Sequence, residues 1–178
     1  LSVGRISQIK NYETLIKAIS ILRDKGLNFF VKIVGRPVMP KDFEYFEKLK
    51  KLVEELKLTN NIEFIGFVPY SHIADYYKEA DILINLAPTG GIDKVVLEAM
   101  ASGPLVLVSN TAFKKYFGDY FEKLIFKYEN AGDLVDKLLM LQSLPVAIKQ
   151  RISDSLVRSV KEGHNLESLI KKISQFFL

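Results

Sequence analysis

The sequence of 178 residues predicts an α/β domain with a doubly wound parallel sheet of six strands and a helical tail. Short apolar runs alternate along the chain with stretches whose apolar residues recur at helical spacing. The apolar runs are almost continuously hydrophobic rather than alternating, which is typical of strands covered by helices on both faces. After Pro145 the spacing is helical only, which predicts the tail.

The predicted strands are residues 1–3, 29–34, 62–65, 82–86, 105–108 and 124–126. Between and after them, apolar stripes predict helices, and the members of these stripes are Tyr12, Leu15, Ile16, Ile19 and Leu22; Phe46, Leu49, Val53 and Leu56; Leu134, Val135, Leu138 and Leu141; Ile148, Ile152, Leu156 and Val160; and Leu166, Leu169, Ile170, Ile173 and Phe177. Asn130 is a candidate N-cap for the third of these helices. Strands and helices in this alternation predict a Rossmann-like unit.

Composition narrows the classes of function. Hydrophobic residues make up 48% and charged residues 26%, which is ordinary for a soluble globular protein. Without cysteine, disulfides and thiolate chemistry are excluded, and two histidines leave little for a metal site. The net charge is +4, and the 25 lysines and arginines are spread along the chain without a basic block. No nucleic-acid-binding arm is therefore indicated. No apolar run approaches the roughly 18 residues of a membrane span.

Four sequence motifs that would indicate other chemistries are missing. No G-x-G-x-x-G follows a strand, and no G-x-x-x-x-G-K-[ST] loop occurs, so dinucleotide and P-loop sites are not predicted. D-x-D and G-x-S-x-G are also missing, which argues against a metal-chelated sugar nucleotide and a hydrolase elbow. The chain opens at Leu1 inside a predicted strand, so we expect it to be part of a longer protein.

Two cations follow the first predicted strand, at the end where ligands of parallel sheets bind. Arg5 comes directly after Gly4, and Lys10 comes five residues later. The planar fork of Arg5 and the point charge of Lys10 together suit two phosphates. A lone cation in such a loop is usually only a solvated surface charge, and that alternative stays open for each of them.

A loop of small residues, 88–93, follows the fourth strand and opens a helix. Around Gly90, Gly91 and Ile92, backbone N–H groups can approach an anion at the helix N-terminus, although a Gly-Gly pair is more often a simple turn. Glu98 lies about one and a half turns inside the helix, where its carboxylate can accept both hydroxyls of a ribose. The alternative is a carboxylate that merely pairs or stays hydrated.

Several short segments, spread over nearly the whole chain, match the motifs of one protein family in the same order. They are residues 3–6 followed by Lys10, Asn11, Leu15, Ile16 and Ala18; Ile33-Val34-Gly35; residues 62–68; residues 80–86; and the helix Leu97-Glu98-Ala99-Met100-Ala101-Ser102-Gly103. In this order they resemble the C-terminal, donor-binding domain of retaining glycosyltransferases of family 4, also called group 1, which have two Rossmann-like domains. The last segment resembles the E-A-M-A-x-G helix of that family.

This resemblance implies a role for each matching residue. Arg5 and Lys10 would bind the donor diphosphate and stabilise the departing nucleoside diphosphate, as catalytic cations without a metal. Glu98 would hold the ribose. The backbone near Gly91 and Ile92 would touch the phosphates. Phe67 and Val68 would flank the base. Taken together, the donor-binding residues that the resemblance implies are Gly4, Phe67, Val68, Gly90, Gly91, Ile92, Asp93 and Glu98.

Two positions depart from the family pattern. The first glutamate of the E-x7-E pair, which addresses the donor sugar in the family, falls at Gly90. Two interpretations of Asp93 stay open: it caps the helix, or it reaches the sugar in place of the missing carboxylate. The proline at Pro104 usually falls one residue later, a change that we expect to affect loop shape only.

The resemblance predicts a donor domain that binds a nucleoside-diphosphate sugar, a UDP- or GDP-sugar, as substrate without any cofactor. The full-length protein would transfer the sugar, with retention, to a glycan, lipid or other acceptor, and residues 1–178 alone would bind nucleotide but transfer nothing. The expected partners are this donor and a missing N-terminal acceptor-binding domain, on which the tail from about residue 146 would pack; nucleic acid is not expected. We expect a cytoplasmic location that includes the cytoplasmic face of the membrane, with peripheral membrane association through the full-length protein.

Two other functions compete with this prediction. One is a non-catalytic nucleotide-binding or scaffold module that kept the fold and lost donor-sugar chemistry at Gly90. The other is a related sugar-nucleotide epimerase or phosphorylase built on the same two-domain plan.

Overall fold

The computed structural model describes residues 1–163. Among these residues it has five strands, which are β1 (Ser2–Val3), β2 (Val31–Val34), β3 (Ile62–Gly66), β4 (Ile82–Asn85) and β5 (Leu105–Val108). The pairs β1–β2, β2–β3 and β4–β5 are all parallel. The predicted α/β class with a parallel sheet is thereby confirmed.

β1 joins the two groups of strands into one spatial order. The main-chain nitrogen of Leu1 donates to the Ile82 carbonyl at 2.9 Å, and the Ile84 nitrogen donates to the Leu1 carbonyl at 2.8 Å. The Ser2 hydroxyl adds a third bond, to the Ile84 carbonyl at 2.9 Å. The order is therefore β3-β2-β1-β4-β5, and the direction of winding reverses between β1 and β4.

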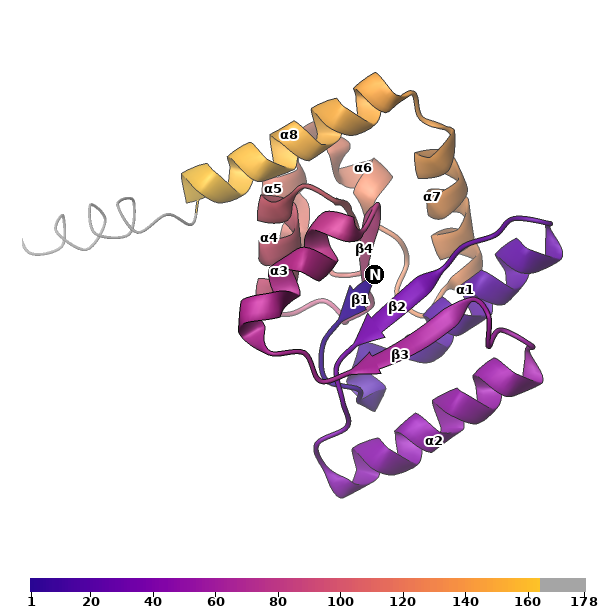
Figure 1. The fold of residues 1–178 in the computed structure, drawn as a ribbon. Helices are drawn as coiled ribbons and strands as arrows, with labels where there is room; N and C mark the ends of the chain where they lie inside the picture. The colour runs from indigo at the N-terminus through magenta and orange to yellow at the C-terminus, as the bar shows by residue number, and fades with distance from the viewer. Residues whose placement is uncertain (164–178) are drawn as a thin grey trace, which may run out of the picture.

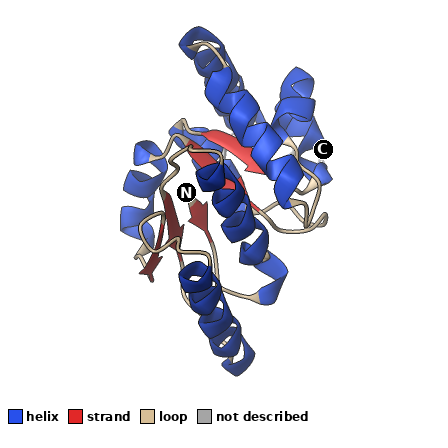
Figure 2. Cartoon of the chain, turned by 90° about the vertical axis from the view of Figure 1, so that its right-hand side faces the viewer, coloured by secondary structure: helices blue, strands red, loops and turns tan. Residues whose placement is uncertain are grey.

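Helices cover the strands in two groups (Figures 1 and 2). The α-helices are α1 (Tyr12–Asp24), α2 (Pro40–Glu55), α3 (Tyr70–Glu79), α4 (Lys94–Ser102), α5 (Lys114–Phe117), α6 (Phe121–Leu124), α7 (Ala131–Ser143) and α8 (Val146–Gly163). Three short 3-10 helices are η1 (Gln8–Lys10), η2 (Thr111–Phe113) and η3 (Gly118–Tyr120). α1 packs against α2 and α7, whereas α4 packs against α3 and α8.

The predicted apolar stripes form the core. The whole stripe of α1, from Tyr12 to Leu22, is buried, and so is the stripe of α7. The Asn130 side chain accepts a bond from the Asp133 nitrogen, so Asn130 is the N-cap of α7, as predicted. The sequence patterns did not predict α3, nor the short helices between residues 111 and 124.

The predicted sixth strand is reduced to a single bridge. Leu124 ends α6, and only Ile125 pairs with Val108 at the edge of the sheet. The Phe126 nitrogen donates to the Val108 carbonyl at 3.0 Å. Leu124 and Phe126 are nevertheless fully buried. The apolar run therefore reflects packing under the last helices rather than a ladder of strand hydrogen bonds.

The predicted helical tail is confirmed for residues 146–163, which form α8, whereas its packing on a second domain stays a prediction. Ile152 and Leu156 of α8 are buried, and the Ser153 hydroxyl donates to the Gly103 carbonyl at 2.6 Å, so α8 packs on the end of α4. The predicted helix around Leu166 to Phe177 lies outside the described residues, and one domain over residues 1–178 stays a prediction. Within residues 1–163, no helix combines the length and the apolar character that crossing a bilayer requires.

Glycines end the three strands β1, β2 and β3 side by side. Gly4, Gly35 and Gly66 have φ values of 151°, 140° and 82°, which disfavour any residue with a side chain. Their main chains are joined: the Gly4 nitrogen donates to the Val34 carbonyl at 2.9 Å, and the Gly35 nitrogen donates to the Gly66 carbonyl at 2.8 Å. A Cβ atom on Gly35 would lie 1.9 Å from the Gly4 carbonyl oxygen. This contact fixes where the chain leaves β1.

We predict that Gly35→Ala lowers the free energy of unfolding by more than about 2 kcal/mol, because the new methyl group forces the Gly4 backbone away and strains φ. Gly90→Ala is the matched control, since a Cβ there meets no atom within 4 Å, and we expect a change under about 0.5 kcal/mol. Urea denaturation followed by circular dichroism measures both. Equal stability of the two variants would show that the backbone contact does not constrain the fold.

Candidate functional site

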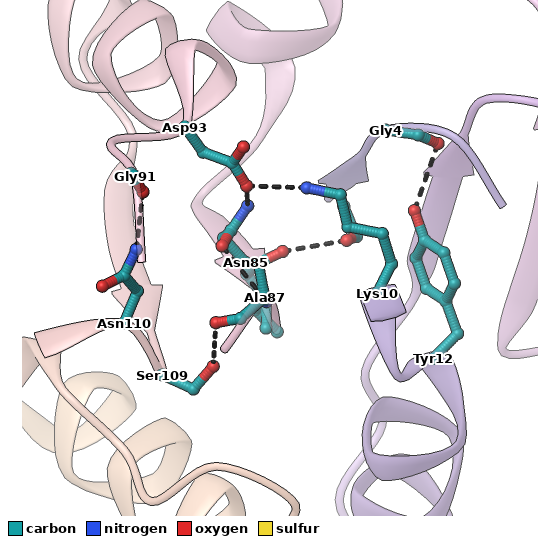
Figure 3. A network of polar contacts seen from close by, with 11 residues as sticks. Gly4, Lys10, Tyr12, Asn85, Ala87, Gly91, Asp93, Ser109 and Asn110 are labelled. Carbon is teal, nitrogen blue, oxygen red and sulfur yellow. Dashed lines mark hydrogen bonds and ion pairs between the residues drawn. The ribbon is translucent and has the colours of Figure 1, made fainter. Parts of the chain in front are cut away.

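The site is built where β1 and β4 end next to each other. The loop after β1 carries Arg5 and Lys10, and the loop after β4 runs through the glycines to α4. Because these strands are neighbours and parallel, their carboxyl ends open at the same edge of the sheet. Figure 3 shows side chains of the two loops meeting across this point.

Lys10 and Asp93 make the direct contact between the loops. The Lys10 ammonium nitrogen lies 2.6 Å from Asp93 Oδ2, and the Asn85 side-chain amide donates to the same oxygen at 2.8 Å (Figure 3). Partial burial acts to raise the pKa of Asp93, but the hydrogen bonds from Lys10 and Asn85 and the charge of Lys10 outweigh it. The pKa of Asp93 therefore lies below its usual value, and the carboxyl group stays ionised.

The capping interpretation of Asp93 is wrong for its side chain. Asp93 occupies the N-cap position of α4, and its carbonyl accepts from the Val96 nitrogen at 3.1 Å. Its carboxylate makes no capping bond, because it is already engaged by Lys10 and Asn85. The first backbone N–H groups of α4 are therefore left without a side-chain cap. The contact with Asp93 thus places the Lys10 ammonium group beside the N-terminus of α4.

The Lys10 side chain is laid down over Gly4 and Tyr12. A Cβ atom on Gly4 would lie 3.4 Å from the Lys10 Cε atom, so the missing side chain makes room for the lysine stem. The buried Tyr12 hydroxyl donates to the Gly4 carbonyl at 3.2 Å (Figure 3). Asn11, with φ of 46°, makes the turn between η1 and α1 that returns the chain to this position.

Arg5 points to α2. Its Nε atom lies 3.7 Å from Asp42 Oδ2, and 49% of its side chain is exposed. Asp42 is buried and also accepts from the main-chain nitrogens of Val38 and Met39, at 3.4 and 3.1 Å. A buried carboxylate thus holds one side of the guanidinium group, and the exposed side is open to an anionic ligand.

Glu98 is held by two tyrosines of α3. The Tyr77 hydroxyl donates to Glu98 Oε2 at 2.9 Å, and the Tyr70 hydroxyl donates to Glu98 Oε1 at 3.5 Å. Glu98 is half-buried, so the carboxylate is neither a purely packed group nor a freely solvated one. The packing of α3 on α4 brings these three side chains together.

The glycine loop is tied to the segment after β5. The Asn110 amide donates to the Gly91 carbonyl at 2.9 Å, and the Ser109 hydroxyl donates to the Ala87 carbonyl at 2.8 Å (Figure 3). Gly90 and Gly91 are exposed, and a Cβ on either would meet open space. Ile92, which follows them, is half-buried. The loop is therefore anchored through the carbonyls of Ala87 and Gly91, while the side-chain positions of its glycines face open space.

Phe67 forms an exposed aromatic surface beside β3. It is 64% exposed, and the Arg36 guanidinium lies 5.0 Å from its ring centroid, within the range of a cation–π contact. Val68, the next residue, is half-buried. A flat ring with one open face suits stacking against a planar group.

The structure joins the predicted residues only in part. Lys10 and Asp93 are in contact, whereas Arg5 binds Asp42 and Glu98 binds the two tyrosines. Two surface hollows among the described residues lie away from these side chains, one along α8 and the other beside α6 and α7. Within residues 1–163, no three His, Cys, Asp or Glu side chains are grouped so that they could hold a metal ion.

Sequence reasoning missed four of the site's partners, although each left a signal. Asn85 is a polar residue at the end of an otherwise apolar strand. Asp42 follows Pro40 at the start of a helix, a position that favours acidic residues. Tyr70 and Tyr77 are seven residues apart, a spacing that puts two side chains on one helix face.

Comparison with known proteins shows the family of the chain. The family model of the glycosyl transferases group 1 matches residues 1–154. An uncharacterized glycosyltransferase of Haemophilus influenzae is 28% identical over 174 residues, which are 97% of this chain and 46% of that protein. The alpha-monoglucosyldiacylglycerol synthase of Streptococcus pneumoniae is 26% identical over 182 residues, which cover 100% of this chain and 38% of that protein.

A solved structure shows the same fold. The crystal structure of the Anabaena protein HepE in complex with UDP superposes with a TM-score of 0.82 at 16% identity, over 99% of this chain and 47% of that one. The chain thus spans less than half the length of each of these three proteins. Because the family model covers most of the chain in a single match, the chain belongs to the glycosyl transferases group 1 family.

Proposed function

We propose that this domain binds the diphosphate of a nucleotide sugar between the loops after β1 and β4. The contact of Lys10 with Asp93 carries the proposal, because it holds an ammonium group beside the uncapped N-terminus of α4. A cation and the N–H groups of a helix N-terminus both attract phosphate. Arg5, which leaves the same strand, supplies the second cation.

The same cations would meet the charge of the departing nucleoside diphosphate. Fixed cations and backbone amides stabilise developing negative charge without reorganising during the reaction. We propose on this basis a transfer that needs no metal, and retention of configuration on the basis of the family pattern. The sugar donor is a UDP- or GDP-sugar, and the binding of UDP by the structurally similar HepE supports the first of these.

Base and ribose would occupy the side of the site toward β3 and α3. Glu98 offers a carboxylate to the ribose hydroxyls, and Phe67 with Val68 offers an apolar face to the base. Asp93 is the carboxylate nearest to the missing glutamate at Gly90 along the chain. We propose that it serves the donor sugar, while its bond to Lys10 keeps it ionised.

For the whole protein, we propose a glycosyltransferase with an N-terminal acceptor-binding domain. This chain covers less than half of the length of its relatives, which supports a second domain in the whole protein. The S. pneumoniae relative is named for a glycolipid product, which supports lipid among the acceptors and peripheral membrane association. A cytoplasmic location, including the cytoplasmic membrane face, follows from where nucleotide sugars are made.

A non-catalytic nucleotide-binding module is the second candidate, and one observation favours it. The position of the family's sugar-binding glutamate is Gly90, which has no side chain. Such a module would keep the diphosphate contacts of Arg5 and Lys10 and lack sugar transfer. Binding of nucleotide alone therefore does not separate the two candidates.

We predict that UDP or GDP at millimolar concentration raises the melting temperature of the chain, and that Arg5→Ala weakens this binding about 10- to 100-fold. The loss of one charge-assisted bond of about 1.5–3 kcal/mol accounts for that range. Thermal shift titrations give the affinities. The control is Arg151→Ala on the exposed side of α8, which we expect to leave the shift unchanged. A wild-type chain that none of UDP, GDP and ADP stabilises would rule out the donor site.

We predict that the full-length protein hydrolyses or transfers sugar from a UDP- or GDP-sugar, and that Lys10→Ala slows this turnover at least about a hundredfold, because a leaving-group contact is lost. Nucleoside diphosphate release is the measurement. Nucleotide binding without turnover in the wild type, together with turnover gained in Gly90→Glu, would identify the non-catalytic module instead. A Cβ atom at position 90 would meet no atom within 4 Å, so the backbone there can carry a side chain.

A further inference from the structure

The two oxygens of the Glu98 carboxylate have partners of opposite character. Oε2 accepts from Tyr77 at 2.9 Å, and Tyr77 is 1% exposed. Oε1 accepts from Tyr70 at 3.5 Å, and Tyr70 is 78% exposed. One bond is therefore short and buried, whereas the other is at the limit of hydrogen-bond length and open to water.

Tyr77 is a permanent donor. It lies on the buried face of α3 with Ile73, so its ring cannot move without disturbing the core. Burial first, then the hydrogen bond to Glu98 and the charge of Glu98, raise the pKa of Tyr77 far above its ordinary value. The hydroxyl group is therefore a proton donor at neutral pH, and it donates to Oε2.

Tyr70 is an exchangeable donor. It is the first residue of α3, and its ring is in solvent rather than in the core. A long hydrogen bond at an exposed site gains little over a bond to water. A ligand hydroxyl that is positioned by other contacts can take its place at Oε1.

We propose that Tyr77 is a positioning residue that holds Glu98 by Oε2 and presents Oε1 to the ribose, whose hydroxyl replaces that of Tyr70. This inference rests on the proposed function, since it takes the ligand of Glu98 to be a nucleoside diphosphate. A glutamate side chain without the buried bond would have to lose its rotamer freedom at the moment of binding. Tyr77 removes that cost before the ligand arrives, which is preorganisation.

The test compares a nucleoside diphosphate with its 2′,3′-dideoxy analogue, which lacks the ribose hydroxyls and keeps the base and the diphosphate. The probe is UDP or GDP, whichever stabilises the wild-type chain more, and calorimetry gives both affinities. We expect the wild type to bind the analogue at least about tenfold more weakly. Tyr77→Phe should lower this preference to about threefold or less by weakening binding of the natural nucleotide. Its affinity for the analogue should stay unchanged.

Two further variants make the comparison specific. Tyr70→Phe keeps an aromatic ring and loses only the exchangeable hydroxyl, so we expect the full tenfold preference or a larger one. Glu98→Gln should lose the preference, as Tyr77→Phe does. Melting temperatures without ligand check that each variant is folded, and a general loss of folding would weaken binding of the nucleotide and its analogue alike.

The outcomes separate this inference from the function on which it rests. If the wild type binds neither nucleotide, the donor site itself is wrong. If the wild type prefers the natural nucleotide and Tyr77→Phe retains the whole preference, the positioning role is overturned while the donor site stands. A Tyr70→Phe variant that loses the preference would instead make Tyr70 the ribose partner, and would also overturn the proposal.

Discussion

The pairing of β4 with the free edge of β1 is the constraint on which the site depends. The chain first winds outward from β1 to β3 and then returns, so that two loops distant in sequence leave the sheet next to each other. Residues 83 positions apart can then form the ion pair of Lys10 with Asp93. The glycine ends of β1 to β3 support this arrangement, because only a residue without a side chain at Gly35 lets the Gly4 backbone approach so closely.

Each cation of the site is held by a carboxylate that can share it. The Lys10 ammonium group has three donors, and one of them is bonded to Asp93. The Arg5 guanidinium group forms an ion pair with Asp42 through one side. Each pair leaves further donors of its cation, and these are the donors that we propose bind phosphate. Since Asp42 is buried and bound by backbone amides, the Arg5 pair is the more firmly placed at its acidic end. The site thus combines two paired cations with donors that are still available.

The two carboxylates, Asp93 and Glu98, lie in different surroundings. Asp93 lies among polar donors at the start of α4, while Glu98 faces the tyrosines of α3 about one and a half turns later. The glycine at position 90 leaves open space where the family pattern has a third acid. This open space is the reason why we propose that Asp93, rather than a residue at position 90, serves the donor sugar. The family assignment and the fold do not depend on that point.

The sequence by itself determined the α/β class, the apolar stripes of α1, α2, α7 and α8, and the family to which the chain belongs. These features follow from local periodicity and ordered motifs, which are properties of neighbouring residues. Only the tertiary structure decided that residues 124–126 pack without forming a full strand, and that Asp93 binds Lys10 instead of capping α4. It also decided which partners hold Arg5 and Glu98. Side-chain partners across the sheet depend on which strands become neighbours, and a linear pattern does not contain that information.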